Sequence, residues 1–324
     1  MKAAVLYEPG GAENFVLEER SIPAPADGQV LIKVKAFGLN RSELMTRKGL
    51  SPSVQFPRVL GIECVGEVVL DPSGALASGQ KVAACMGEMG RAFDGSYAEY
   101  TILPKGLLYP FESKLSWEEL GAMPEMFQTV YGSLHLALKI ATGHSLLIRG
   151  GTSSIGMLAT QLAKRSGLQV IATTRKREKT DQLLNNGADD VLIDDGALAS
   201  KVKAIYPDGV DHVLELVGAS TLKDSLQCAA PGGSVCMTGM LSEQWSIPDF
   251  APMEYIPAAV HLTVYDSGQL RATRQSFQQF IREVEAGFVR LNISGLFTLD
   301  EISAAHRFME SNAAAGKIVV TTSA

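Results

Sequence analysis

A turn of small residues between two apolar segments is the part of the chain best suited to hold a phosphate group. We expect strands at 145–148 and 169–173 and a helix at 156–166, with the turn before the helix. In such a turn the backbone can approach a pyrophosphate closely, and the helix start offers unpaired N–H groups and a positive dipole end. The order strand, turn, helix, strand therefore predicts a dinucleotide-binding unit. Its expected phosphate-binding residues are Gly151, Thr152, Ser153, Ser154 and Ile155.

The turn departs from the strict pattern G-x-G-x-x-G at one position. Ser153 stands where the middle glycine would be, between Gly151 and Gly156. Its side chain must either point away from the phosphates or bond to them, and the sequence leaves both open. An ordinary α/β turn, in which Gly156 only allows close helix packing, is the alternative to a dinucleotide site.

The second strand of this unit ends in a basic cluster. Thr174 and Arg175 are followed by three more basic residues, the last of which is Lys179. An Asp or Glu at this place would bind the ribose hydroxyls of NAD, whereas basic residues suit the additional phosphate of NADP. Thr174, Arg175 and Lys179 are therefore predicted to bind NADPH, and a solvated surface run is the alternative. One observation argues against that alternative. We expect a helix at 176–185, and cations at its N-terminus interact unfavourably with the helix dipole, by roughly a few tenths of a kcal/mol each. A bound anion between the cations would offset this cost.

Composition and charge exclude several classes of partner. The chain has 324 residues, of which 46% are hydrophobic and 20% charged, and its net charge is −6. These values are typical of a globular protein and do not favour nucleic acid or an anionic membrane surface. The N-terminal apolar stretch is too short for a signal peptide, and no apolar run reaches membrane-spanning length. We therefore expect a cytoplasmic protein that binds neither nucleic acid nor a membrane.

The cysteines and histidines lack the spacing of a zinc site. No C-x-x-C occurs, and no histidine lies three to five residues from another. No metal site is predicted, and the cysteines are expected to be small buried residues in a reducing compartment. They are Cys64, Cys85, Cys228 and Cys236.

The pattern of predicted elements changes along the chain. Up to about residue 115, short apolar or alternating runs separated by turn residues predict an all-β barrel or sandwich. Strands and helices then alternate, which predicts a parallel, doubly wound sheet with a last strand at 259–265. The elements that follow resemble the first part again. The predicted fold is α/β with two domains, one formed by 1–118 and 266–324 and the other by 119–265.

Further motifs occur in a consistent order along the chain. They are G-L-N-R-S-E at 38–43, P-R-V-L-G-I-E-C-V-G at 57–66, G-S-Y-A-E-Y at 95–100, T-V-Y-G at 129–132, the turn at 151–156 and G-K-I-V-V at 316–320. Together they resemble the medium-chain dehydrogenase/reductase superfamily, specifically its zinc-free quinone oxidoreductase branch, over essentially the whole chain. The resemblance implies a GroES-like β-barrel domain and a Rossmann domain, in agreement with the two predicted domains.

The resemblance also implies that no zinc is bound. Zinc-dependent relatives place a Cys, a His and a further Cys or Asp around their catalytic metal. The matching positions in this chain are Asn40, Ile62 and Glu125, and two of them are poor zinc ligands. The structural zinc loop of those relatives, with its four cysteines, is missing as well.

By resemblance, Asn40 is expected nearest the nicotinamide, and Thr129 against its ring and ribose. The alternatives are a turn asparagine that bonds its own backbone and a helix N-cap, respectively. Lys317 matches a position on the cofactor side of the cleft, although a strand-edge lysine on a solvated face is the alternative. Val217 and Gly239 are predicted to contact the cofactor, because ligands lie at the carboxyl ends of parallel strands.

The implied function is hydride transfer from NADPH to a quinone or an activated alkene such as an α,β-unsaturated carbonyl. Relatives often carry tyrosines where Met45 and Ser51 stand, and this chain therefore lacks those hydroxyl groups as proton donors. The proton that the reduced acceptor takes up is expected to come from water. Some relatives hold NADPH as structural or regulatory proteins with little turnover, which is the alternative function. The family often pairs its Rossmann sheets edge to edge, and this predicts a homodimer.

Overall fold

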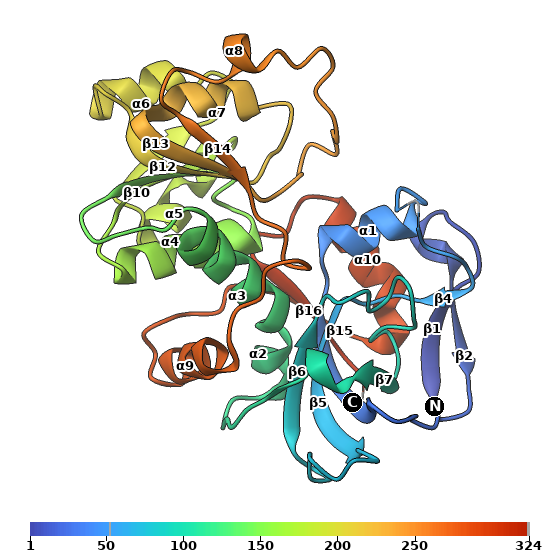
Figure 1. Cartoon of the computed structure of the whole chain (residues 1–324). Coiled ribbons are helices and arrows are strands. Elements are labelled where there is room, and N and C mark those ends of the chain that lie inside the picture. Colours follow the sequence, from blue (N-terminus) through green and yellow to red (C-terminus); the bar gives the residue numbers. More distant parts are fainter. Residues whose placement is uncertain (52, 323–324) are drawn as a thin grey trace. The chain divides into compact units, whose positions relative to one another are not determined.

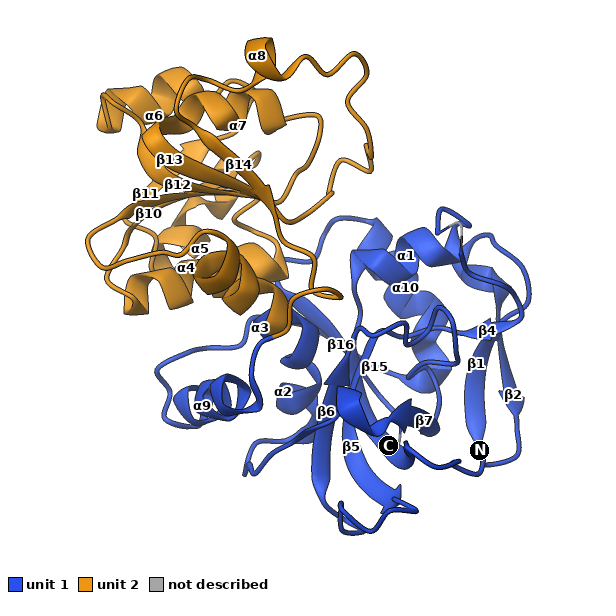
Figure 2. Ribbon diagram, viewed as in Figure 1, with its two compact units in different colours: residues 1–127, 272–324 blue, residues 128–271 orange. Residues whose placement is uncertain are grey.

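The computed structural model describes residues 1–51 and 53–322, which form two compact units. Unit 1 comprises Met1–Phe127 and Ala272–Ala324, and unit 2 comprises Gln128–Arg271 (Figure 2). The chain thus builds part of unit 1, then all of unit 2, and returns to unit 1. The sequence pattern placed the divisions earlier, after residues 118 and 265.

Unit 1 is rich in antiparallel β-structure. Its strands are β1 (Lys2–Leu6), β2 (Phe15–Glu19), β3 (Gln29–Gly38), β4 (Arg58–Val59), β5 (Glu63–Leu70), β6 (Lys81–Cys85), β7 (Tyr100–Pro104), β8 (Tyr109–Pro110), β15 (Ile293–Thr298) and β16 (Lys317–Thr321). One sheet has the order β2-β1-β4, and the other has the order β15-β16-β3-β5-β6-β8, with β7 paired to β3. All these pairs are antiparallel except β15 with β16.

The helices of unit 1 lie between and after these strands. They are α1 (Arg41–Arg47), α2 (Trp117–Gly121), the start of α3 (Pro124–Tyr131), α9 (Arg274–Glu285) and α10 (Ile302–Glu310), with 3₁₀ turns η1 (Ala12–Asn14), η2 (Lys105–Leu107) and η5 (Leu299–Glu301). Helix α2 packs on β3 and β16. These contacts explain why α2 belongs to unit 1.

Unit 2 contains a six-stranded parallel sheet. Its strands are β9 (Ser145–Arg149), β10 (Gln169–Thr174), β11 (Asp190–Ile193), β12 (Val210–Glu215), β13 (Ala229–Met237) and β14 (His261–Val264), in the order β11-β10-β9-β12-β13-β14. Every pair is parallel. The central segment Leu146–Ile148 of β9 is fully buried, as expected for a parallel strand covered on both faces. The α/β class and the doubly wound parallel sheet predicted from the sequence are confirmed.

Helices cover both faces of this sheet. Figure 1 shows α4 and α5 on one face and α6 and α7 on the other. Their bounds are α4 (Ser154–Arg165), α5 (Thr180–Asn185), α6 (Ala199–Ile205) and α7 (Leu222–Cys228). Unit 2 also contains the π-helical turn η3 (Gly132–Ala137), the 3₁₀ turn η4 (Arg177–Lys179) and the short helix α8 (Pro252–Tyr255). Among the helices formed by residues 1–51 and 53–322, none has the length and apolar character to cross a membrane.

A short segment after β14 is held within unit 2 by the side chains of Tyr265 and Gln128, the latter donating to the carbonyl oxygen of Ser267 at 2.8 Å. Tyr265 is buried, and its hydroxyl lies 2.6 Å from the carbonyl oxygen of Leu270 and 3.0 Å from that of Gln128. The ring packs against Gly132, where an added Cβ would lie 1.9 Å from it. Residues 266–270 are therefore fastened to the start of unit 2, which explains why the division falls later than the sequence pattern placed it.

Candidate functional site

The turn after β9 has the backbone geometry that a phosphate site requires. Gly150 has a φ of +94°, which L side chains rarely adopt. A Cβ at Gly156 would lie 2.5 Å from the carbonyl oxygen of Gly150, so this position must also be glycine if α4 is to start so close to β9. The first turn of α4 leaves backbone N–H groups without intrahelical partners, and these are suited to an anion.

Ser153 is the N-cap of α4. Its hydroxyl donates a hydrogen bond to the carbonyl oxygen of Gly150 at 2.8 Å and accepts one from the backbone N–H of Gly156 at 3.0 Å. The only hydroxyl proton is therefore used within the turn. The serine therefore holds the turn closed by bonding to the backbone of the turn itself.

The basic cluster follows the end of β10. Thr174 is 5% exposed, and its hydroxyl accepts a hydrogen bond from the backbone N–H of Lys176 at 3.1 Å, whereas Arg175 is exposed. The helix expected at 176–185 begins later, because residues 177–179 form a 3₁₀ turn and α5 starts at Thr180. The basic residues of the cluster therefore precede α5, with Lys179 as its N-cap residue.

The ends of β12 and β13 lie beside each other at the same edge of the sheet as the phosphate turn. Glu215, the last residue of β12, is fully buried, and one of its carboxylate oxygens accepts hydrogen bonds from the backbone of Val217 and Gly218 at 2.6 and 2.9 Å. Gly239 follows β13, and an added Cβ there would lie 2.5 Å from the carbonyl oxygen of Leu216. The structure thus brings Val217 and Gly239 to the edge that also carries residues 151–155, 174 and 175.

A buried arginine that the sequence analysis did not single out lies behind the phosphate turn. Arg149 is 0% exposed and ends β9. Its Nε and Nη2 donate to both carboxylate oxygens of Asp194 at 2.8 Å each, and Nη1 donates to Asp224 at 2.8 Å. Nη1 also lies 3.1 Å from the hydroxyl of Ser225, which bonds to Glu215. One guanidinium therefore ties together the carboxyl ends of β9 and β11 and the start of α7.

Thr129 lies inside α3, so the helix N-cap considered for it is wrong. It is 7% exposed, and its carbonyl oxygen accepts a hydrogen bond from the hydroxyl of Ser133 at 2.7 Å. That hydroxyl lies 2.9 Å from the hydroxyl of Thr238, the residue before Gly239. Thr129 is therefore one helical turn from the carboxyl end of β13.

In unit 1, Asn40 and Lys317 are in direct contact. The Lys317 ammonium lies 2.6 Å from Oδ1 of Asn40 and 2.6 Å from Oε1 of Glu63, and Nδ2 of Asn40 lies 2.9 Å from the same Oε1. Lys317 and Glu63 are 1% and 0% exposed, while Asn40 is partly exposed. Burial by itself lowers the pKa of Lys317, but the surrounding carboxyl groups, Glu63 first among them, together raise that pKa above its ordinary value, so the ammonium stays charged. The solvated strand-edge lysine considered for this position is therefore wrong.

A second buried carboxyl group fixes the backbone around Asn40. Glu43 accepts hydrogen bonds from the backbone N–H groups of Asn40 at 2.7 Å and Ile62 at 3.1 Å. Burial raises the pKa of Glu43 to about 8, against the opposing effect of these two donors. Asn40 is the N-cap of α1 and forms a capping box with Glu43, and its Nδ2 lies 3.4 Å from the carbonyl oxygen of Gly38. Its side chain thus bonds to its own turn as well as to the distant Lys317 and Glu63.

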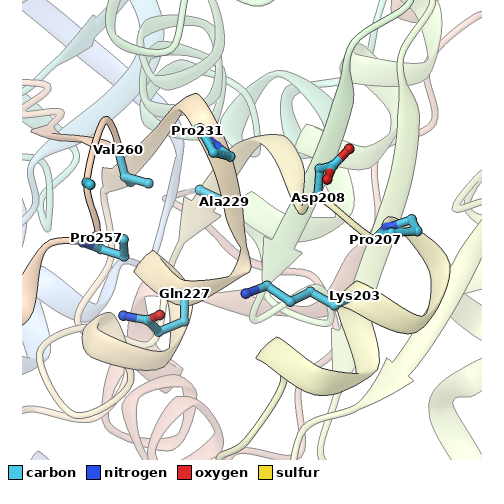
Figure 3. Close-up of a pocket in the computed structure, with 9 residues that line it drawn as sticks. Lys203, Pro207, Asp208, Gln227, Ala229, Pro231, Pro257 and Val260 are labelled. Atoms are coloured by element: carbon cyan, nitrogen blue, oxygen red, sulfur yellow. The ribbon is translucent and has the colours of Figure 1, made fainter.

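The described part of the chain has no cluster of metal ligands, and the pocket found in unit 2 lies away from the predicted cofactor-binding residues. Within residues 1–51 and 53–322, no three His, Cys, Asp or Glu side chains lie close enough together to hold a metal ion. A surface pocket of about 280 Å³ in unit 2 includes Lys203, Asp208 and Gln227 (Figure 3). It lies near the amino ends of β12, β13 and β14, so it contains none of the predicted nucleotide-binding residues.

Two family models match the chain. The model described as "Alcohol dehydrogenase GroES-like domain" matches residues 26–113, and the model described as "Zinc-binding dehydrogenase" matches residues 154–286. Quinone oxidoreductase of Homo sapiens is 28% identical over 331 residues, which cover 99% of this chain and 97% of that protein. The chain belongs to the medium-chain dehydrogenase/reductase superfamily, in its quinone oxidoreductase branch. The resemblance to the quinone oxidoreductase branch inferred from the motifs is confirmed, and the absence of zinc stays a prediction.

Solved structures of this superfamily have the same fold. A mycobacterial protein, Rv1454c, in complex with NADPH is 25% identical with a TM-score of 0.87, over 99% of this chain and 100% of that one. A 2-haloacrylate reductase is also 25% identical with a TM-score of 0.87, over 100% of both chains. The match to the GroES-like model lies within unit 1, and the match to the zinc-binding dehydrogenase model covers most of unit 2 and continues into unit 1.

Proposed function

We propose that the protein is an oxidoreductase that transfers hydride from NADPH to a quinone or an activated alkene, without a catalytic zinc. The human relative named quinone oxidoreductase and the solved 2-haloacrylate reductase support this acceptor class. Both names describe acceptors in which an electron-poor double bond takes up hydride readily. Asn40 and Thr129 are the residues that we propose beside the nicotinamide.

The observation that carries the nucleotide proposal is the turn from Gly150 to Gly156 followed by a basic strand end. The turn fits a pyrophosphate because its backbone requires glycine at Gly150 and Gly156 and because α4 starts there. Arg175 is exposed at the end of β10, where it can form charge-assisted hydrogen bonds to a phosphate on the adenosine ribose. We therefore propose NADPH rather than NADH, with contacts from Thr152–Ile155, Thr174, Arg175, Lys179, Val217 and Gly239.

We propose that no zinc is bound, because two of the three side chains at the positions of the zinc ligands in relatives are poor metal ligands. At the three positions that match the zinc ligands of relatives, Ile62 offers only hydrocarbon, and the amide of Asn40 is already bonded to Lys317 and Glu63. The buried Lys317 ammonium also supplies a positive charge where a second cation would be repelled. NADPH supplies the hydride when bound, and we propose that water supplies the proton.

The proposed function is tested by measuring NADPH oxidation with a panel of ortho-quinones and α,β-unsaturated ketones and acids. Turnover with at least one acceptor, with unchanged rates after chelation of zinc, is expected. Tight NADPH binding without turnover of any acceptor would favour an NADPH-binding structural or regulatory protein instead. One zinc per chain in a metal analysis would overturn the zinc-free assignment. The homodimer and the cytoplasmic location stay predictions.

Replacing Arg175 with alanine is expected to weaken NADPH binding about 10- to 100-fold and to leave NADH binding within about twofold. The reason is that a hydrogen bond between charged groups contributes roughly 1.5–3 kcal/mol, and only NADPH carries the phosphate. The dissociation constants of NADPH and NADH are measured from the fluorescence of the reduced nucleotides. The matched control is Arg165→Ala at the exposed far end of α4, which should change neither constant. Equal weakening of both nucleotides would contradict the phosphate contact.

A further inference from the structure

The Asn40 side chain can adopt only one amide orientation in its surroundings. A lysine ammonium only donates hydrogen bonds, and an ionised carboxylate only accepts them. Lys317 lies at Oδ1 of Asn40, and Glu63 lies at Nδ2. Rotating the amide by 180° would place its NH₂ group against the ammonium and its carbonyl against the carboxylate, so both contacts would become repulsive.

The two charged residues are themselves held in place. The second carboxylate oxygen of Glu63 accepts a hydrogen bond from the backbone N–H of Glu125 at 2.8 Å. A Cβ at Gly38 would lie 2.1 Å from Cε of Lys317 and 2.6 Å from Oε1 of Glu63, so the pair fills the space beside this glycine. Lys317 and Glu63 form a buried ion pair, whereas Asn40 is partly exposed. The amide of Asn40 is therefore the exposed member of this group of three side chains.

We propose that Lys317 and Glu63 are positioning residues that make Asn40 a hydrogen-bond donor toward the acceptor substrate. One Nδ2–H is bonded to Glu63, and among the residues that the structure describes the partner found for the other is the carbonyl oxygen of Gly38, at a long 3.4 Å. The ammonium at Oδ1 draws electron density from the amide and strengthens this second N–H as a donor. It is suited to a carbonyl oxygen on which negative charge develops as hydride adds to a quinone or enone. Lys317 acts through Asn40 in this arrangement and does not itself touch the cofactor.

This inference rests on the proposed function, and its test separates the two. The variant Glu63→Gln/Lys317→Met removes both charges together, so that no buried charge is left alone. Its kcat with the best acceptor is expected to fall at least about tenfold, while its NADPH dissociation constant stays within about twofold. The control, Lys35→Met/Glu67→Gln, removes the partly exposed pair of the same types between β3 and β5 and should change neither quantity. Unchanged kcat, or a rise in the NADPH constant that accounts for the loss, would overturn the proposal.

A second readout does not depend on turnover. In protein labelled with ¹⁵N at asparagine, Asn40→Asp identifies the side-chain amide signal of Asn40 by its loss. We expect two widely separated proton shifts for this amide, the one bonded to Glu63 being downfield, and we expect the separation to collapse in Glu63→Gln/Lys317→Met. Ordinary, closely spaced shifts in the unchanged protein would show that the amide is not held and would overturn the proposal. If no acceptor is turned over, the proposed function fails while this measurement still decides the orientation of the amide.

Discussion

Replacing Arg149 with methionine is expected to lower the free energy of unfolding by about 3–5 kcal/mol. The guanidinium is fully buried and bonds to the carboxylates of Asp194 and Asp224 at 2.8 Å. Methionine provides comparable aliphatic length but leaves these carboxylates, and the buried Glu215 beside them, without a cation. Urea unfolding followed by circular dichroism measures the loss.

Two further substitutions show whether the shape of the guanidinium matters. Arg149→Lys keeps the charge but cannot bond to both oxygens of Asp194 and to Asp224 at once, so an intermediate loss is expected. Arg177→Met, at an exposed position of unit 2, should change the free energy of unfolding by less than about 0.5 kcal/mol. An Arg149→Met protein as stable as the unchanged one would mean that water solvates these carboxylates, and it would contradict the buried cluster.

This cluster shows what the sequence pattern does not contain. Arg149 bonds to residues that lie 45 and 75 positions later, and such partners have no local signature. The only available signal was a charged residue at the end of the otherwise apolar strand Leu146–Ile148. By contrast, the strand, turn and helix around Gly150–Gly156 were predictable because their pattern is continuous in the sequence.

Short strands at sheet edges were also missed. β2 and β15 are edge strands of their sheets, and β4 and β8 contain two residues each. Such strands have little room for an alternating pattern, and their existence depends on the neighbour that they pair with. The parallel strands of unit 2 were predictable because burial on both faces requires apolar runs.

For the candidate site in unit 1, the family motifs located the residues but not their contact. Asn40 and Lys317 lie 277 positions apart, and each was expected near the cofactor independently of the other. Their pairing follows from the fold, because β16 pairs with the end of β3 that precedes Asn40. The chemical role of the amide therefore became visible only when Glu63 and Lys317 were placed on either side of it.

As the pH falls from 6.5 to 4.5, His306 is expected to make a destabilising contribution to unit 1, opposite in sign to the contribution of Glu43. Burial and, to a smaller extent, the Arg47 charge together lower the pKa of His306 from its ordinary value of 6.5 to about 3. Below pH 6.5 the unfolded chain therefore binds a proton at this residue that the folded protein does not. The contribution of His306 to the free energy of unfolding is thus fully present above pH 6.5 and decreases as the pH falls. One residue contributes about 1.4 kcal/mol per pH unit, or about 2–3 kcal/mol over this range.

His306→Gln isolates this contribution. Nε2 of His306 lies 3.0 Å from the hydroxyl of Tyr97, and the amide of glutamine can reach the same hydroxyl without taking up a proton in this pH range. The variant should therefore lose less stability than the unchanged protein between pH 6.5 and 4.5, as measured by urea unfolding at each pH. His212, whose pKa is lowered to about 4 mainly by burial, accounts for part of the remaining slope, and His261→Gln at an exposed position should leave the slope unchanged. If His306→Gln had the same acid slope as the unchanged protein, His306 would have to take up its proton in the folded state, which its full burial beside Arg47 opposes.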